Sequence, residues 1–322
     1  MTVLVTGVAG FIGSHVARAL LDRGDRVVGV DDLNAYYDVS LKRARLARLT
    51  GSSAFSFFER DVSDREGMEA VRAAEPGISG IVHLAAQAGV RHSLVDPYAY
   101  VRSNVMGHLT MLELARRLDG LRRFVYASSS SVYGSSAKLP FVVGDPVDAP
   151  RSLYAATKRA DEMMSDVYVH THGLTLTGLR FFTVYGPWGR PDMAPWIFAR
   201  SIFAGERIEV FNLGLVKRDF SYVDDVVDGV LRAYDRAGER PGHALYNLGA
   251  SRGEDLMRFI ALLERAIGKG ATIDLQPAQL GDVPETAADI EATRRDLGWS
   301  PKTPIEEGVP RFVDWFRDYH RL

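Results

Sequence analysis

Tyr154 and Lys158 are four residues apart in the segment YAATK. On a helix this spacing puts both side chains on one face, where the ammonium can lie close to the phenol. A nearby cation favours phenolate, and lowering a tyrosine pKa from about 10 to about 7 requires roughly 4 kcal/mol of differential stabilisation. Tyr154 could then act as a general base that takes a hydroxyl proton while hydride leaves the same carbon.

Four consecutive serines, 128–131, follow an apolar segment at 122–128 that has the pattern of a buried strand. A serine hydroxyl there could share the path of the proton, so we expect Ser128 and Ser129 to act with the Tyr–Lys pair. A tyrosine and a lysine at this spacing also occur on helix surfaces. The serine run and a glycine motif near the N-terminus favour the catalytic interpretation.

That motif consists of Gly7, Gly10 and Gly13, directly after a short apolar run. Glycines allow a tight turn that brings the N-terminus of the next helix, with its unpaired N–H groups, against a phosphate. Phe11 and Ile12 lie within the same turn. The pattern predicts a dinucleotide pyrophosphate site.

Asp31 ends the next strand-like run, 26–31, and lies 18 residues beyond the last glycine of the motif. A carboxylate at this point is placed to accept both ribose hydroxyls of the adenosine. A 2′-phosphate would be repelled, and no arginine follows to receive it. We therefore expect NAD as the cofactor rather than NADP.

Strand-like runs alternate with amphipathic helical segments through the first 180 residues. These runs lie at 2–6, 26–31, 55–59, 80–84, 122–128 and 174–180. Such alternation predicts an α/β fold with a doubly wound parallel Rossmann sheet. Substrates of such folds bind at the carboxyl ends of the strands.

The regular alternation of strand-like and helical segments ends after residue 181, where prolines and glycines interrupt it. Short strands near 208–212, 244–248 and 272–275 mix there with helices near 253–266 and 305–319. We expect a smaller C-terminal substrate-binding domain. The expected division is 1–180, with 217–246 returning to it, as the NAD-binding domain, and 181–216 with 247–322 as the substrate domain.

Two expected long helices, 98–118 and 152–172, carry more apolar residues than one buried stripe requires. The apolar positions are Val101, Val105, Leu109, Leu112 and Leu114 on the first helix, and Met163, Met164, Val167 and Val169 on the second. Either both faces are buried within the sheet sandwich, or the second face forms a homodimer interface. The pattern alone leaves the two interpretations open.

The net charge of −2 gives no support to a nucleic-acid partner or a polybasic membrane anchor. Cysteine is absent, which excludes disulfides, thiolate metal ligands and a cysteine nucleophile. The eight histidines lack ligand spacing, so no metal is assigned. No apolar run reaches the roughly 18 residues of a membrane span, so we expect a cytoplasmic protein.

The glycine motif, Asp31, the segment HLAA at 83–86, the serine run and the Tyr–Lys pair resemble the extended short-chain dehydrogenase/reductases that act on nucleotide sugars. Within that group, the segments DDLNAYYD at 31–38, QAGVR at 87–91, GLRFFTVYGPWGRPDM at 178–193 and KRDF at 217–220 are similar to UDP-glucuronate 4-epimerases. The similarity extends over essentially the whole chain. It implies epimerisation at C4 of a UDP-linked uronic acid.

The resemblance also implies roles for individual residues. Ser129 stands where relatives place the catalytic serine or threonine. Implied cofactor contacts are Asp32, Asn34, Asp61, Val62, Leu84, Ala85, Ala86 and Asn104, besides the glycine turn, Asp31, Tyr154 and Lys158. Implied substrate contacts are Arg91, Ser129, Ser130, Thr183, Arg190, Phe211, Asn212, Arg218, Gln279 and Asp282. For Arg91 a surface position is an equal alternative, and for Arg218 the alternative is an ion pair with Asp219.

Catalytic residues that related enzymes carry and this chain lacks distinguish between the reactions that this fold supports. Relatives that eliminate water carry an Asp-Glu pair where Ser130 and Ser131 stand, and relatives that decarboxylate UDP-glucuronate carry Glu in place of Ser131. The implied reaction is therefore epimerisation through a 4-keto sugar. The alternatives are a 4-epimerase of another UDP-hexose, a UDP-glucuronate decarboxylase and a non-catalytic NAD-binding protein.

A uronic acid oxidised at C4 is a β-keto acid, which loses CO₂ readily when its carboxylate stands perpendicular to the carbonyl plane. The site must hold that carboxylate near the plane. We expect Thr183, Arg190 and the serine hydroxyls to do so, because arginine can hold a carboxylate through two bonds. The alternative is that Arg190 is a surface residue in a Pro/Gly loop.

Overall fold

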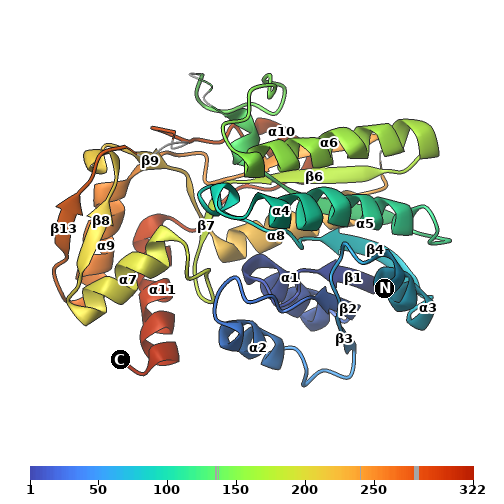
Figure 1. Ribbon diagram of the computed structural model, residues 1–322, viewed down its shortest axis with the longest axis horizontal. Coiled ribbons are helices and arrows are strands. Elements are labelled where there is room, and N and C mark those ends of the chain that lie inside the picture. The colour runs from blue at the N-terminus through green and yellow to red at the C-terminus, as the bar shows by residue number, and fades with distance from the viewer. Residues whose placement is uncertain (135, 137, 240, 279–282) are drawn as a thin grey trace.

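A seven-stranded parallel sheet forms the centre of the computed structural model, which describes residues 1–134, 136, 138–239, 241–278 and 283–322 (Figure 1). Its strands are β1 (Thr2–Thr6), β2 (Arg26–Asp31), β3 (Phe55–Glu59), β4 (Ile78–His83), β5 (Arg123–Ser129), β6 (Leu176–Phe181) and β11 (His243–Leu248). The spatial order is β11-β6-β5-β4-β1-β2-β3. The chain therefore moves outward from β1 in one direction, then returns to β4 on its other side. A crevice forms at such a switch point.

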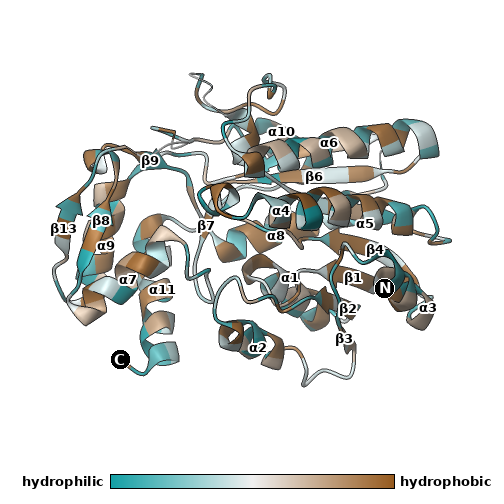
Figure 2. Cartoon of the chain, viewed as in Figure 1, coloured by the Kyte–Doolittle hydropathy of each residue, from teal (hydrophilic) through white to brown (hydrophobic). Residues whose placement is uncertain are grey.

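Helices cover both faces of this sheet, which explains why its strands are apolar on both sides. Val3 and Val5 face one hydrophobic core, whereas Leu4 between them faces the other. One layer contains α1 (Phe11–Asp22) and α8 (Val223–Arg236); the other contains α3 (Arg65–Ala74), α5 (Gly107–Ala115) and α6 (Leu153–His172). Figure 2 shows hydrophobic residues along β1, and helices on which hydrophobic and hydrophilic residues alternate.

The predicted α/β class and parallel Rossmann sheet are confirmed. All six strands expected in the first 180 residues join the large sheet, and their ends differ from the expected ones by at most two residues. The strand expected near 244–248 is β11, which pairs with β6 at the sheet edge. The chain thus returns to the first sheet after residue 242.

Most of the remaining elements gather at one side of the molecule (Figure 1). They are α7 (Ala194–Ala204), β8 (Arg207–Val210), α9 (Leu256–Ile267), β13 (Thr272–Leu275) and α11 (Ile305–His320), with β8 and β13 paired in parallel. Short pairs join β7 (Thr183–Tyr185) to β10 (Phe220–Tyr222), and β9 (Lys217–Arg218) to β12 (Glu254–Asp255). The helix α10 (Glu291–Leu297) packs on α8 and β11, and α2 (Val39–Ala47) packs on α1.

The expectation of one regular helix over 98–118 is wrong. The segment consists of α4 (Pro97–Tyr100), a π-helical stretch η2 (Val101–Met106) and α5. Within the wide π turn, the buried Asn104 side chain accepts a bond from the Gln87 amide (2.8 Å) and donates to the Gln87 carbonyl (3.1 Å). Asn104 also donates to Thr157 on α6 (2.9 Å). The wider turn places one buried amide against both segments, and π turns often occur at such sites.

The closest packing in the glycine turn gives a test. A Cβ added at Gly13 would lie 2.1 Å from the Gly7 carbonyl oxygen, whereas one added at Gly51 meets nothing within 4 Å. We expect Gly13→Ala to lower the free energy of unfolding by about 1–3 kcal/mol, the usual cost of overpacking. Gly51→Ala should stay within about 0.5 kcal/mol. Urea denaturation of both variants measures this, and equal midpoints would contradict the close approach.

Candidate active site

A cavity lies at the carboxyl ends of β1, β2, β4 and β5, and the segment that follows β6 forms another wall. It brings together most of the residues singled out from the sequence. These are Gly7, Gly10, Phe11, Ile12, Gly13, Asp31, Asp32, Asn34, Asp61, Val62, Leu84, Ala85, Ala86, Ser128, Ser129, Tyr154, Lys158 and Arg190. Residues far apart in the chain therefore meet where the strand order reverses.

The Asp31 carboxylate is fixed at one end of the cavity. Its Oδ2 accepts the Ala9 amide at 3.0 Å and its Oδ1 accepts the Leu33 amide at 2.9 Å. Each oxygen keeps a further lone pair for a ribose hydroxyl. Burial raises the pKa of Asp31, while the nearby Lys42 ammonium opposes that rise.

The N-terminus of α1 faces the same cavity through Gly10 and the first residues of the helix. The first N–H groups of a helix have no intrahelical acceptor and attract phosphate oxygens. Together with the fixed carboxylate of Asp31, this donor set fits a dinucleotide with a pyrophosphate and a free ribose diol. Lys42, which the sequence analysis missed, is buried nearby and donates to Asn34 at 3.1 Å.

Tyr154 and Lys158 both line the cavity from the first turns of α6. The Ser152 hydroxyl caps this helix by accepting the Ala155 amide at 3.1 Å, which fixes where the turn carrying Tyr154 begins. The Lys158 ammonium is buried and donates to the Ala127 carbonyl at 3.0 Å. A rigid helix start therefore presents the phenol and the cation together.

Asp161 is a second partner of Lys158 that the sequence analysis missed. Its Oδ2 lies 3.0 Å from the Lys158 ammonium, and both side chains are almost fully buried. Burial raises the pKa of Asp161 to about 6, although the Lys158 charge opposes the rise. The i,i+3 spacing on one helix was a signal that could have identified this pair.

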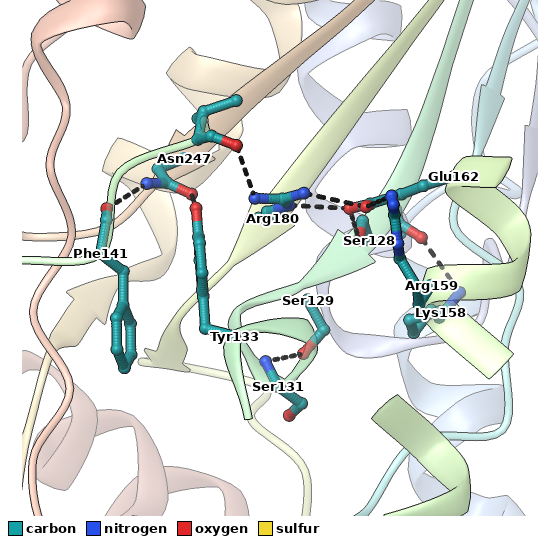
Figure 3. A network of polar contacts seen from close by, with 12 residues as sticks. Ser128, Ser129, Ser131, Tyr133, Phe141, Lys158, Arg159, Glu162, Arg180 and Asn247 are labelled. Carbon is teal, nitrogen blue, oxygen red and sulfur yellow. Dashed lines mark hydrogen bonds and ion pairs between the residues drawn. The ribbon is translucent and has the colours of Figure 1, made fainter. Parts of the chain in front are cut away.

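Behind the cavity, a buried ion pair orients the serine run (Figure 3). Arg180 on β6 donates to both carboxylate oxygens of Glu162 on α6, at 2.8 and 2.9 Å. The Ser128 hydroxyl donates to the same carboxylate at 2.7 Å. Burial acts to raise the pKa of Glu162, but the bonds from Arg180 and Ser128 hold it below its ordinary value.

These bonds separate the two serines that were expected to be catalytic. The Ser128 proton is committed to Glu162, so Ser128 is a poor candidate for passing a proton to a substrate. The Ser129 oxygen accepts the Ser131 amide at 3.2 Å, which leaves its own O–H available in the cavity. The expectation for Ser128 is therefore revised to a supporting role, because its one donor is already used.

Arg190 lines the cavity but already has an anionic partner. It forms a two-pronged ion pair with Asp192, in which Nε donates to Oδ1 at 3.0 Å and Nη2 donates to Oδ2. The Tyr36 hydroxyl donates to the same Asp192 at 3.0 Å. Burial acts to lower the pKa of Arg190, but Asp192 and the phenols of Tyr154 and Tyr36 raise it above its ordinary value. The arginine therefore stays charged beside Tyr154.

The model of the NAD dependent epimerase/dehydratase family matches residues 3–249. The chain belongs to this family. It is 45% identical over 334 residues to UDP-glucuronate 4-epimerase 4 of Arabidopsis thaliana, covering 99% of this chain and 76% of the relative. A probable UDP-glucuronate 4-epimerase of Rhizobium meliloti is 41% identical, with 100% and 98% covered.

Solved structures show the same likeness. UDP-glucuronic acid 4-epimerase from Bacillus cereus, in complex with UDP-glucuronic acid and NAD, has a TM-score of 0.92 at 32% identity, covering 99% of this chain and 100% of that one. UDP-glucose 4-epimerase from Thermotoga maritima, with UDP-glucose, has a TM-score of 0.89 at 31% identity, with the same coverage. The fold thus serves both charged and neutral sugars.

Several expected contacts of this epimerase/dehydratase chain do not line the cavity. Asn104 holds the backbone of Gln87, a cavity residue, instead of lining the cavity itself. Arg91 stacks on the Phe211 ring, with 4.7 Å from the guanidinium carbon to the ring centre. Asn212 donates to the Leu215 carbonyl at 2.9 Å. The other residues expected to bind substrate that lie outside the lining are Ser130, Thr183, Phe211 and Arg218, while Gln279 and Asp282 fall outside the described residues.

Arg218 and Thr183 are both tied into the second half of the chain. Arg218 donates to the carbonyls of Lys217 (3.0 Å) and Pro284 (3.3 Å), and its strand β9 pairs with β12. The Thr183 amide donates to the Asp219 carbonyl at 3.0 Å. Asp219 is fully buried and its Oδ2 accepts the Ala288 amide, so the alternative of a surface ion pair with Arg218 is not supported.

Among the described residues, no three or more His, Cys, Asp or Glu side chains lie close enough together to hold a metal ion. Within the same part of the chain, no helix is long and apolar enough to span a membrane.

Proposed function

We propose that the protein is an NAD-dependent UDP-glucuronate 4-epimerase, which interconverts UDP-glucuronate and UDP-galacturonate. The observation that carries this proposal is one cavity that holds the Tyr154–Lys158 pair and, beside the phenol, the charged Arg190. The pair suits oxidation of a sugar hydroxyl, and the arginine suits a sugar that carries a carboxylate. The identity of 41–45% over the whole chain to UDP-glucuronate 4-epimerases supports the same substrate.

NAD, when bound along the glycine turn and Asp31, supplies the group that accepts hydride from C4 of the sugar and returns it. Tyr154 takes the O4 proton as hydride leaves C4, which gives a 4-keto sugar. The sugar then turns about its phosphate linkage, so that hydride returns to the opposite face while Tyr154 gives the proton back to O4. Lys158 favours the phenolate, and Ser129 donates a hydrogen bond to the reacting oxygen.

A neutral UDP-hexose is the second candidate substrate, because the UDP-glucose 4-epimerase of Thermotoga maritima is nearly as similar in structure. The charged Arg190 in the cavity lining argues against it. A neutral sugar offers this guanidinium only hydroxyl acceptors, whereas a uronate offers it a carboxylate. The enzyme should therefore prefer the charged sugar.

A homodimer is part of the proposal. The apolar positions on the two long helical segments separate in the structure into buried and exposed residues: Leu112 and Leu114 are in the core, but others remain on the surface. Leu94, Val95, Tyr98, Val101, Met106, Met163 and Val167 are between 48% and 84% exposed. They lie on the α4–η2 region and on α6, which pack side by side (Figure 1). A second copy can cover such a patch by two-fold symmetry.

We place the reaction in the cytoplasm, where NAD and nucleotide sugars are available. The roles proposed for the remaining residues follow the cavity. Asp32, Asn34, Asp61, Val62, Leu84, Ala85 and Ala86, which line the cavity, would contact the cofactor. Thr183 lies outside the lining, between the lining residues Phe182 and Val184, and would join Arg190 at the sugar.

The first test follows UDP-glucuronate by its sugar proton signals, without added NAD. The wild-type protein should form UDP-galacturonate. Tyr154→Phe should retain NAD but lose at least about 10²-fold in turnover, the usual contribution of a general base. Tyr168→Phe is the control, because Tyr168 is on the same helix and its hydroxyl binds Glu113 instead. A wild-type protein that converts UDP-glucose but not UDP-glucuronate would contradict the proposed substrate.

The second test concerns decarboxylation. The 4-keto sugar is either reduced to a UDP-uronate or loses CO₂ to give a pentose. Losing one charged hydrogen bond to the uronate, worth roughly 1.5–3 kcal/mol, should raise the ratio of pentose to uronate product by about 10- to 100-fold. We expect this for Arg190→Ala and Thr183→Ala, and not for Arg200→Ala, an exposed residue on α7. Mass spectrometry detects the pentose. Wild-type KM and no additional pentose in the first two variants would remove both residues from the site.

The third test concerns assembly. Met163→Glu together with Val167→Glu places two charges on the exposed apolar patch and should yield monomers in light scattering. Leu215→Glu, at another exposed apolar residue, should leave the dimer intact. A wild-type protein that is monomeric at all concentrations would contradict the homodimer.

A further inference from the structure

Arg45 on α2 is fully buried, although the mechanism gives it no task. Its Nε and Nη2 donate to the Trp188 carbonyl at 3.1 and 2.7 Å, and Nη2 also donates to the Gly189 carbonyl at 2.8 Å. Its Nη1 donates to the Ala9 carbonyl at 3.2 Å. A buried guanidinium is costly unless its donors are satisfied, and here three backbone carbonyls and the Tyr37 hydroxyl, which accepts from Nη1 at 2.6 Å, satisfy them.

The carbonyls that Arg45 holds belong to two functional segments. Ala9 lies inside the glycine turn, and Trp188 and Gly189 directly precede Arg190. One planar fork therefore fixes the turn for the dinucleotide and the backbone from which Arg190 projects. A lysine cannot reproduce this, since its donors spread from a single point rather than from a planar fork.

The backbone at Trp188 needs such support. Its φ is +64°, in the left-handed region that bulky residues rarely adopt. Besides the two bonds from Arg45 to its carbonyl, its indole ring lies under the guanidinium of Arg48, 4.9 Å from the ring centre. Contacts from one helix thus hold a disfavoured conformation two residues before Arg190.

The Arg190 guanidinium itself is held from the same segment of the chain. Tyr36 donates to Asp192 at 3.0 Å, and Asp192 holds Nε and Nη2 of Arg190. This ion pair does not use Nη1, the third nitrogen of the guanidinium. The segment 32–48 therefore contacts residues 188–192 in three ways: at the backbone carbonyls of 188 and 189, at the Trp188 ring and at the Asp192 carboxylate.

We propose that the segment 32–48 positions Arg190 for the uronate, with Arg45 acting through the backbone of Trp188 and Gly189 and Tyr36 acting through Asp192. Both are positioning residues, and the inference rests on the proposed function. The segment begins directly after Asp31. One continuous piece of chain therefore connects the carboxylate at the cofactor end of the cavity with the side chains that position Arg190.

The test measures dissociation constants of UDP-glucuronate and UDP-glucose by calorimetry on NAD-saturated protein. Arg45→Lys should weaken UDP-glucuronate binding by about 10- to 100-fold, the effect of losing a charged hydrogen bond, and UDP-glucose binding by less than about threefold. Tyr36→Phe should show the same selectivity with a smaller loss. Arg43→Lys, at an exposed arginine of the same helix, should change neither.

A double-mutant cycle shows whether the effect passes through Arg190. In an Arg190→Ala background, Arg45→Lys and Tyr36→Phe should add no further loss of UDP-glucuronate affinity. Equal losses for both sugars, or losses that add to that of Arg190→Ala, would overturn the inference.

The unfolding midpoint of each variant shows whether a loss of uronate affinity comes from a loss of stability or from a displaced Arg190. If Arg45→Lys does not fold, Tyr36→Phe decides, and an unchanged uronate affinity in that variant overturns the inference. Failure of the wild type to convert UDP-glucuronate overturns the proposed function instead, and is distinguished by the conversion assay.

Discussion

Buried positive charge must meet an acceptor, because an unpaired cation inside a protein costs several kcal/mol. This constraint shapes the whole cavity. Lys158 is paired with Asp161, Arg180 with Glu162 and Arg190 with Asp192. Asp161 and Asp192 lie three and two residues after their cations, and Glu162 lies on α6, which packs on the strand β6 that carries Arg180. None of these three cations is therefore unpaired, and under the proposed reaction the charges of Lys158 and Arg190 are available beside the sugar.

Strand geometry explains why the two serines have different environments. Successive side chains of a strand point to opposite faces, so Ser128 and Ser129 at the end of β5 cannot both face one group. Ser128 meets the carboxylate that Arg180 holds, whereas Ser129 begins the next turn. The alternation rule could have separated them from the sequence, but only with the strand end known to within one residue.

The sequence allowed us to predict features that depend on residues close together in the chain. It did not allow us to predict contacts between residues far apart in the chain. The glycine turn, the strands and the Tyr154–Lys158 pair depend on local spacing, and their elements appear at the expected places. The roles of those site residues stay predictions. The contacts of Arg45 join residues 143 and 144 positions apart, which no periodicity reveals. The π turn around Asn104 has no comparable signal, because its sequence also suits a regular helix.

Under the proposed reaction, a fixed arginine has a consequence for the turning sugar. Asp192 occupies one side of the Arg190 fork and Tyr36 anchors Asp192, so the guanidinium cannot follow the carboxylate as the 4-keto sugar turns. The carboxylate must leave one set of donors and meet another. A charged bond worth roughly 1.5–3 kcal/mol in one orientation only would bias the two bound sugars by about 10- to 100-fold. Because an enzyme leaves the equilibrium in solution unchanged, this bias must appear as a difference between the affinities of the two UDP-uronates.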